Sequence, residues 1–181
     1  IRPAEGAHRR TRWTAVLVEP PHGHGLVSLR TTLPNELIRR ALQEQALDEF
    51  AEWRLVRTEW PHGRSRLDFL LEDPCGGRLV LEVKSVTLVE DGIARFPDAV
   101  TARGARHVRE LTELVQEGRM AAAILFVLQR DDGRIIEAAR GIDPAFADAL
   151  ADARQAGVRI LGRRCRVSMK AVELGDPVPV R

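Results

Sequence analysis

Hydrophobic residues recur with two different periods along the 181-residue chain, and each period predicts a different kind of element. Segments in which apolar and polar residues alternate, rich in β-branched and aromatic types, predict strands. Strands are expected at residues 13–18, 26–29, 53–59, 65–71, 78–88, 121–128, 158–161 and 166–169. Because residues 121–128 are apolar without interruption, we expect this strand at the centre of a sheet, buried on both faces.

Apolar residues spaced three to four positions apart predict three helices. They are expected from Pro34 to about Phe50, from just after Asp98 to about Gln116, and from Asp143 to Gly157. Clusters of Gly, Pro and Asp predict turns at residues 73–77 and 131–133. Strands interspersed with helices predict an α/β fold, with a mixed β-sheet flanked by helices.

Composition narrows the class of protein. With 44% hydrophobic and 30% charged residues, the chain is not disordered, collagen-like or a coiled coil. Its longest apolar stretch, residues 120–128, is about half of what spans a bilayer, so we expect no membrane partner. Cys75 and Cys165 are isolated, which argues against a zinc site and is typical of the reducing cytoplasm. Since the chain begins at Ile1 rather than Met, we expect an N-terminal piece to be missing.

The basic residues are unusual in kind rather than in number. Of 28 basic residues only Lys84 and Lys170 are lysine, and a coding bias towards arginine is the simplest explanation. The formal net charge of +2 neither requires nor excludes nucleic acid. Arginines gather at residues 9–12, 64–66 and 163–166, where they could either follow phosphates or form solvated faces.

The most informative residues lie on the two expected strands that flank the turn at 73–77. Alternate residues of a strand share a face, so Arg66 projects with Asp68, and Glu82 with Lys84. On the other face we expect Leu67, Phe69 and Leu71 of the first strand, and Leu81 and Val83 of the second.

If the turn is centred on Cys75, Asp68 lies directly across from Glu82, with side chains about 5 Å apart. Two facing carboxylates repel each other unless a cation lies between them, and hard oxygen ligands suit Mg²⁺ or Mn²⁺. With Lys84 beside them, the three side chains form the catalytic set of a metal-dependent phosphodiesterase. The alternative is an ordinary surface ion pair between Lys84 and one carboxylate.

Three longer motifs support the first interpretation. Residues 59–69 (EWPHGRSRLDF), 82–88 (EVKSVTL) and 96–107 (FPDAVTARGARH) closely resemble the sugar fermentation stimulation protein A family, and residues 33–37 and 157–161 are also similar to it. The resemblance spans nearly the whole chain. It implies a DNA-binding protein with an N-terminal OB-like barrel, followed by a PD-(D/E)xK restriction-endonuclease-like domain, and a regulatory link to maltose metabolism. On this basis residues 1–30 are the remnant of the barrel, and residues 31–181 are the nuclease-like domain.

The same resemblance implies roles for individual residues. It makes Asp68, Glu82 and Val83 the metal site. The expected DNA contacts are Arg66, Ser85, Thr101, Arg103 and His107. Arg103 and His107 would lie beside the scissile phosphate, with Gly104 allowing close approach to the sheet. Alternatively, Asp98 caps the helix, Arg103 pairs with a carboxylate, and His107 is half-buried.

The chain departs from the family at the first helix. A glutamate that nucleases of this superfamily often use as a metal contact is replaced by Arg40, and Arg30 stands where the family tends to have a small polar residue. Glu36 could substitute, although an acid in the first turn of a helix is already favoured by the helix dipole. The expected metal site therefore depends on Asp68 and Glu82.

The sequence thus predicts a cytoplasmic DNA-binding protein with an Mg²⁺- or Mn²⁺-dependent endonuclease site. Two other interpretations stay open. One is a non-catalytic DNA-binding transcriptional regulator on a nuclease scaffold, and the other is an interaction module of a sugar pathway in which the carboxylates only form ion pairs. A homodimer is one arrangement that we also keep open.

Overall fold

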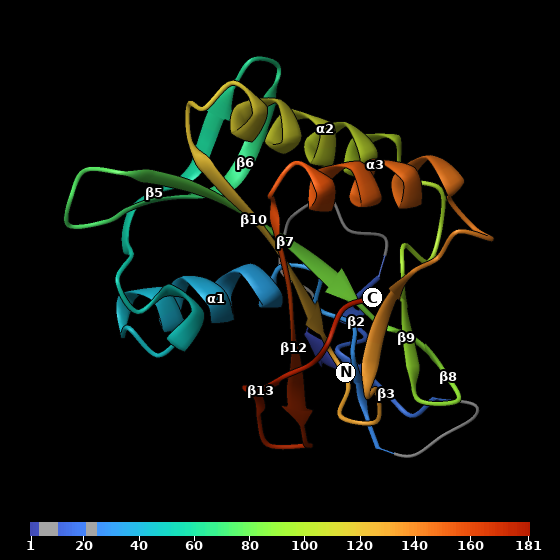
Figure 1. Cartoon of the computed structure of the whole chain (residues 1–181). Helices are drawn as coiled ribbons and strands as arrows, with labels where there is room; N and C mark the ends of the chain where they lie inside the picture. The colour runs from blue at the N-terminus through green and yellow to red at the C-terminus, as the bar shows by residue number, and fades with distance from the viewer. Residues whose placement is uncertain (4–10, 21–24) are drawn as a thin grey trace.

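A six-stranded mixed sheet forms the centre of the computed structural model, which describes residues 1–3, 11–20 and 25–181 (Figure 1). In spatial order its strands are β13 (Val172–Pro177), β12 (Arg159–Val167), β10 (Ala121–Leu128), β7 (Arg78–Val86), β6 (Ser65–Glu72) and β5 (Arg54–His62). The neighbours β7, β10 and β12 run parallel, and the outer pairs are antiparallel. As predicted, residues 121–128 form a central strand.

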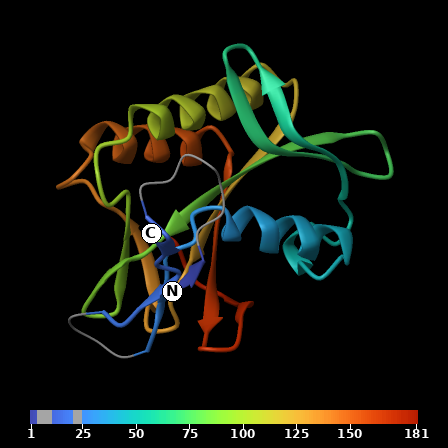
Figure 2. The same ribbon diagram turned by 180° about the vertical axis from the view of Figure 1, so that it is seen from behind.

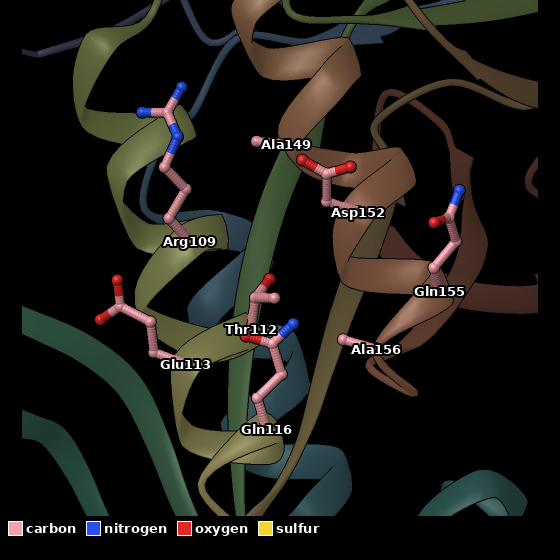
Figure 3. Close-up of a pocket in the computed structure, with 8 residues that line it drawn as sticks. All are labelled: Arg109, Thr112, Glu113, Gln116, Ala149, Asp152, Gln155 and Ala156. Carbon is pink, nitrogen blue, oxygen red and sulfur yellow. The ribbon is translucent and has the colours of Figure 1, made fainter.

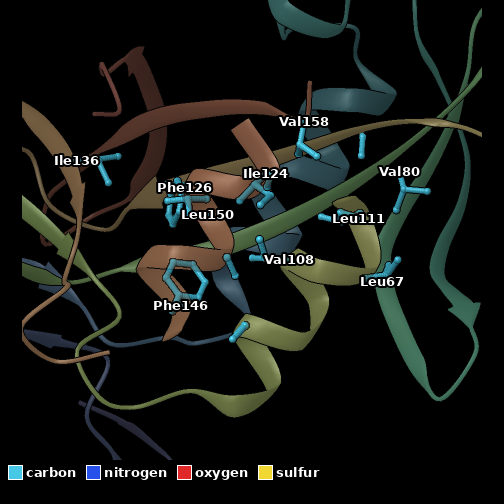
Figure 4. Close-up of a cluster of buried hydrophobic side chains, with 14 of the residues drawn as sticks. Leu67, Val80, Val108, Leu111, Ile124, Phe126, Ile136, Phe146, Leu150 and Val158 are labelled. Carbon is cyan, nitrogen blue, oxygen red and sulfur yellow. The ribbon is translucent and has the colours of Figure 1, made fainter. Parts of the chain in front are cut away.

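Helices cover both faces of this sheet. The helix α1 (Leu33–Gln43) lies on one face, and α2 (Ala102–Gln116) and α3 (Pro144–Gln155) lie together on the other (Figures 1 and 2). Each face has its own hydrophobic core. Under α2 and α3, Val108 and Phe146 pack against Phe126 of β10 (Figure 4), while Ile38 of α1 packs in the opposite core. The predicted α/β class with a mixed sheet flanked by helices is therefore confirmed.

Smaller sheets complete the described part of the chain. The strands β8 (Leu88–Glu90), β9 (Ile93–Phe96) and β11 (Ile135–Ala138) form a three-stranded sheet, in which β9 contacts β7 and β11 contacts α3. Near the N-terminus β1 (Arg2–Pro3) pairs with β2 (Trp13–Thr14), and β3 (Leu17–Val18) with β4 (Val27–Ser28). The assignment of residues 1–30 to a barrel remnant stays a prediction. Among the described residues, no helix is both long enough and apolar enough to span a membrane.

The helix expected at 34–50 is longer than the one observed. The observed helix α1 ends at Gln43, because Gln45 adopts a positive φ of 51° that is incompatible with a continuing helix. A short 3₁₀ helix, η1 (Asp48–Phe50), follows. Leu47 and Phe50 continue the apolar spacing and are buried in the same core as α1, although they belong to a different element. Periodicity alone could not separate the two.

Strand boundaries also differ from the prediction. Residues 78–88 contain all of β7 and the first residue of β8, whose hairpin with β9 was not expected. Residues 13–18 divide into β2 and β3. The two expected closing strands at 158–161 and 166–169 are one strand, β12, and the last strand, β13, was missed because it contains Gly175 and Pro177, which are rare in strands.

Candidate active site

The candidate site lies where the neighbouring strands β6 and β7 separate, and we call this point the fork. These strands pair only from Phe69 opposite Leu81 to Glu72 opposite Arg78. Beyond this point β6 continues as a hairpin with β5, while β7 stays paired with β10 as far as Val86. The register is the predicted one, so Asp68 and Glu82 face each other where the two strands begin to separate.

In the fork, carboxylates replace the usual backbone partners. The Val83 N–H donates to Oδ2 of Asp68 at 2.7 Å, and the Asp68 N–H donates to Oε2 of Glu82 at 3.3 Å. Each carboxylate therefore accepts a hydrogen bond from the opposite strand. This exchange holds the two acidic side chains at the mouth of the fork, since the backbone groups that would otherwise pair across it are occupied.

Asp68 receives a second hydrogen bond from α1, because Nδ2 of Asn35 donates to its Oδ1 at 2.7 Å. Burial, together with the nearby charge of Glu82, raises the pKa of Asp68 to about 6. The role of Asn35 was missed. It belongs to the motif at residues 33–37 that the family resemblance singled out, but nothing local in the sequence shows that it reaches a strand 33 residues further on.

Glu82 lies deeper, between Lys84 and His107. Its Oε1 accepts from Nζ of Lys84 and from Nδ1 of His107, each at 2.7 Å, and the three side chains are only 5%, 10% and 3% exposed. Burial alone would raise the pKa of Glu82, but the hydrogen bonds from His107 and Lys84 and the positive charge of Lys84 outweigh it, so this pKa is lowered. Glu82 is therefore held as the carboxylate.

A short chain of hydrogen bonds connects Glu82 to the protein surface. Nε of Arg103 donates to Nε2 of His107 at 3.4 Å, which assigns the proton of the neutral ring to Nδ1, facing Glu82. His107 thus acts as a positioning group that orients the Glu82 carboxylate through a hydrogen bond. Its side chain is buried rather than half-buried. The Arg103 side chain donates to this histidine and, among the described residues, to no carboxylate.

One cavity of about 250 Å³ brings almost all the predicted site residues together. Its lining includes Asp68, Glu82, Val83, Lys84, Ser85, Thr101, Arg103 and His107, together with Thr31 and Asn35. The exception is Arg66, which is exposed and pairs with Glu59 at 3.2 Å outside this cavity.

Side-chain directions differ from the prediction. Leu67, Phe69 and Leu71 do not share a face: Leu67 packs in the core under α2 and α3, and the other two pack in the core under α1. We attribute this to twisting of β6 at the fork, where it loses β7 as a partner. Glu82 and Lys84 are buried beneath α2, because both faces of β7 are covered.

The start of α2 also needs correction. Thr101, not Asp98, caps the helix, since its Oγ1 accepts from the Gly104 N–H at 3.0 Å. A Cβ at Gly104 would lie 2.7 Å from Cγ2 of Thr101. The glycine therefore makes room for the capping side chain rather than for the sheet.

The first helix contributes an amide, not a carboxylate, to the site. Glu36 accepts from Nη2 of Arg30 at 2.9 Å and from Oγ1 of Thr32 at 2.8 Å, and Arg40 pairs with Glu44. Within the described ranges, no group of three or more His, Cys, Asp or Glu side chains is arranged to hold a metal ion. Any cation in the fork would therefore rest on Asp68 and Glu82.

The other candidate surfaces lie apart from this cavity. Arg163 is buried and binds Glu49 at 2.7 Å, so it holds the fold together, while Arg9 and Arg10 lie outside the described residues. A groove of about 440 Å³ runs between α2 and α3, lined by polar side chains such as Arg109 and Asp152 and by none of the predicted site residues (Figure 3).

Comparisons with known proteins give a consistent result. A family model described as "Sugar fermentation stimulation protein RE domain" matches residues 32–171. The sugar fermentation stimulation protein homologue of Shouchella clausii is 46% identical over 178 residues, covering 98% of this chain and 76% of that protein. The Moorella thermoacetica homologue is 43% identical over 173 residues, covering 96% and 73%.

A solved structure agrees with these sequence comparisons. The structure of Pyrococcus furiosus SfsA in complex with Ca²⁺ superposes with a TM-score of 0.87 at 26% sequence identity, covering 98% of this chain and 76% of that one. The chain described here belongs to the sugar fermentation stimulation protein family.

Proposed function

We propose that this protein binds DNA and hydrolyses its phosphodiester backbone, using a divalent cation held by Asp68 and Glu82. The observation that carries the proposal is that the partly buried Asp68 and the buried pair of Glu82 and Lys84 line one cavity. An ammonium group 2.7 Å from a buried carboxylate, which itself faces a second carboxylate, is costly to assemble unless the site binds a charged ligand.

The side chains present fit a hard divalent cation. Asp68 and Glu82 offer carboxylate oxygens, and Val83 can add only its backbone oxygen, because its side chain is apolar. The raised pKa of Asp68 reflects its burial and the repulsion from Glu82, and a cation between the carboxylates would offset that repulsion. The related Pyrococcus furiosus protein is described in complex with Ca²⁺, a cation that takes the same class of ligand. Mg²⁺ or Mn²⁺ would serve in the reaction.

Each residue has a distinct task in this scheme. When bound, the cation supplies charge stabilisation at the phosphate and lowers the pKa of water. Lys84 can turn one of its ammonium protons towards the phosphate or the attacking water while another stays on Glu82. Arg103, at the edge of the cavity, neutralises phosphate charge, and the hydroxyls of Ser85 and Thr101 can donate to phosphate oxygens.

Plasmid nicking in Mg²⁺ or Mn²⁺ tests the proposal. Wild-type protein should convert supercoiled plasmid to the open circle, and Lys84→Ala and Asp68→Asn should each abolish the conversion. Lys170→Ala is the matched control, since Lys170 is the other lysine and is exposed. Equal nicking by wild type and Lys84→Ala would show that the fork is not the catalytic site.

A second candidate function, a non-catalytic DNA-binding regulator linked to sugar metabolism, is favoured by one observation. Protein groups already donate to all four oxygens of the two carboxylates. No third carboxylate from α1 joins them, since Glu36 is engaged by Arg30. If the protein is such a regulator, the wild type would bind DNA without nicking it, and DNA binding would persist in Lys84→Ala.

A further inference from the structure

A second cavity, of about 520 Å³, adjoins the active-site cavity. The two cavities share Thr31, Asn35 and Asp68 in their linings, so they meet at the fork. The second cavity continues from Asp68 between the first turns of α1, where Arg39 lines it, and β5, where Thr58 lines it. A nucleic acid strand with one phosphate in the first cavity would therefore place the chemical group joined to that phosphate in the second cavity.

The two cavities differ in charge. The second is lined by three carboxylates, those of Glu36, Glu59 and Asp68, against the single guanidinium of Arg39. In the first cavity, two carboxylates face Lys84 and Arg103. The charges of the first cavity are balanced and those of the second are more negative, so phosphate is favoured in the first cavity over the second.

The remaining lining of the second cavity suits a neutral group. Arg30 and Arg66 hold Glu36 and Glu59 at 2.9 and 3.2 Å, which leaves the carboxylates partly neutralised but able to accept hydrogen bonds. Threonine hydroxyls can donate or accept, and Phe69 adds apolar surface at the base. A nucleobase with its sugar has this mixture of apolar faces and polar edges.

We propose that the second cavity is a nucleoside subsite, which takes the base and sugar joined to the phosphate bound beside Lys84. This inference rests on the proposed function, because the phosphate must occupy the first cavity. A base that enters a pocket must leave the duplex stack, so the preferred substrate is a single strand, or a position where the base is unpaired.

Titration with small phosphates in the presence of Ca²⁺, followed by NMR, tests the subsite without relying on cleavage. The ligands are inorganic phosphate, deoxyribose 5-phosphate, and the 3′- and 5′-monophosphates of thymidine. One thymidine monophosphate should bind about tenfold more tightly than the two ligands that lack a base.

Thr58→Trp should fill the second cavity and so remove the extra affinity for the thymidine monophosphate, while leaving the Kd for inorganic phosphate unchanged. Val56→Trp is the matched control, because Val56 is 53% exposed on the same strand and does not line the cavity. Equal affinity of wild type for phosphate and both monophosphates would overturn the subsite alone. Absence of any phosphate binding near Lys84 would overturn the subsite and the proposed function together.

Discussion

Lys84 illustrates how much of the site depends on the shape of single side chains. In a chain whose basic residues are otherwise almost all arginine, this lysine projects into a narrow fork, with its side chain 10% exposed and its ammonium 2.7 Å from Glu82. A guanidinium is planar and broad, and it cannot rotate single donors as an ammonium can. The fork therefore explains a lysine at this position better than charge alone does.

Lys84→Arg should lower the rate of plasmid nicking about 100-fold or more, although the charge is kept, because a misplaced donor no longer stabilises the transition state. Nicking rates in Mn²⁺, together with the thermal unfolding temperature, check this. Lys170→Arg should behave as wild type. Full activity of Lys84→Arg would mean that only the charge at this position matters.

His107 should act through Glu82 rather than on the substrate. Since its Nδ1–H fixes a buried carboxylate, His107→Ala should raise the Mn²⁺ concentration needed for half-maximal nicking about tenfold, with a smaller effect at saturating Mn²⁺. His107→Asn, which can still donate to Glu82, should restore part of the affinity. A loss of activity that saturating Mn²⁺ does not relieve would instead indicate a direct role in the reaction.

At the scale of elements, the fork between β6 and β7 decides where the chemistry lies, and part of it was predictable. The turn at 73–77 sets the register that brings Asp68 opposite Glu82, and alternation puts Lys84 beside Glu82. The separation of the strands was not predictable, because it depends on β7 pairing with β10, some 40 residues further along the chain. Asn35 and His107 reach the site only through that tertiary packing.

The ion pair between Glu49 in η1 and Arg163 in β12 joins two elements that are distant in the sequence, and we expect it to stabilise the fold. Burial alone would raise the pKa of Glu49, but the hydrogen bond and the charge of Arg163 outweigh it, so this pKa is lowered in the folded state. The pair therefore stabilises the fold above the unfolded pKa of Glu49, and the contribution is lost as pH falls through the folded pKa.

Glu49→Ala should lower the free energy of unfolding at pH 7 by about 3 kcal/mol, because it leaves the buried Arg163 without its carboxylate partner. The difference from wild type should shrink as pH falls through the folded pKa of Glu49. Urea denaturation across this range measures both effects. Glu52→Ala is the control, since Glu52 is exposed, and a loss of stability as large as that of Glu49→Ala would contradict the account.

At the scale of the whole molecule, the sheet brings together residues from four distant segments. Asn35 comes from α1, Asp68 from β6, Glu82 and Lys84 from β7, and His107 from α2. The α/β class and the central strand followed from hydrophobic periodicity, but the meeting of α1 and α2 at one cavity depends on their lying on opposite faces of a forked sheet. A cation in the fork would link both faces through Asp68 and Glu82.

Anomalous scattering from a crystal grown with Mn²⁺ tests most directly whether a cation binds between Asp68 and Glu82. We predict an anomalous peak between the carboxylates of Asp68 and Glu82, within about 2.3 Å of an oxygen of each, and no peak there in Asp68→Asn. A fork that keeps the Val83 N–H on Asp68 and the Lys84 ammonium on Glu82, with Mn²⁺ bound only elsewhere, would contradict the account.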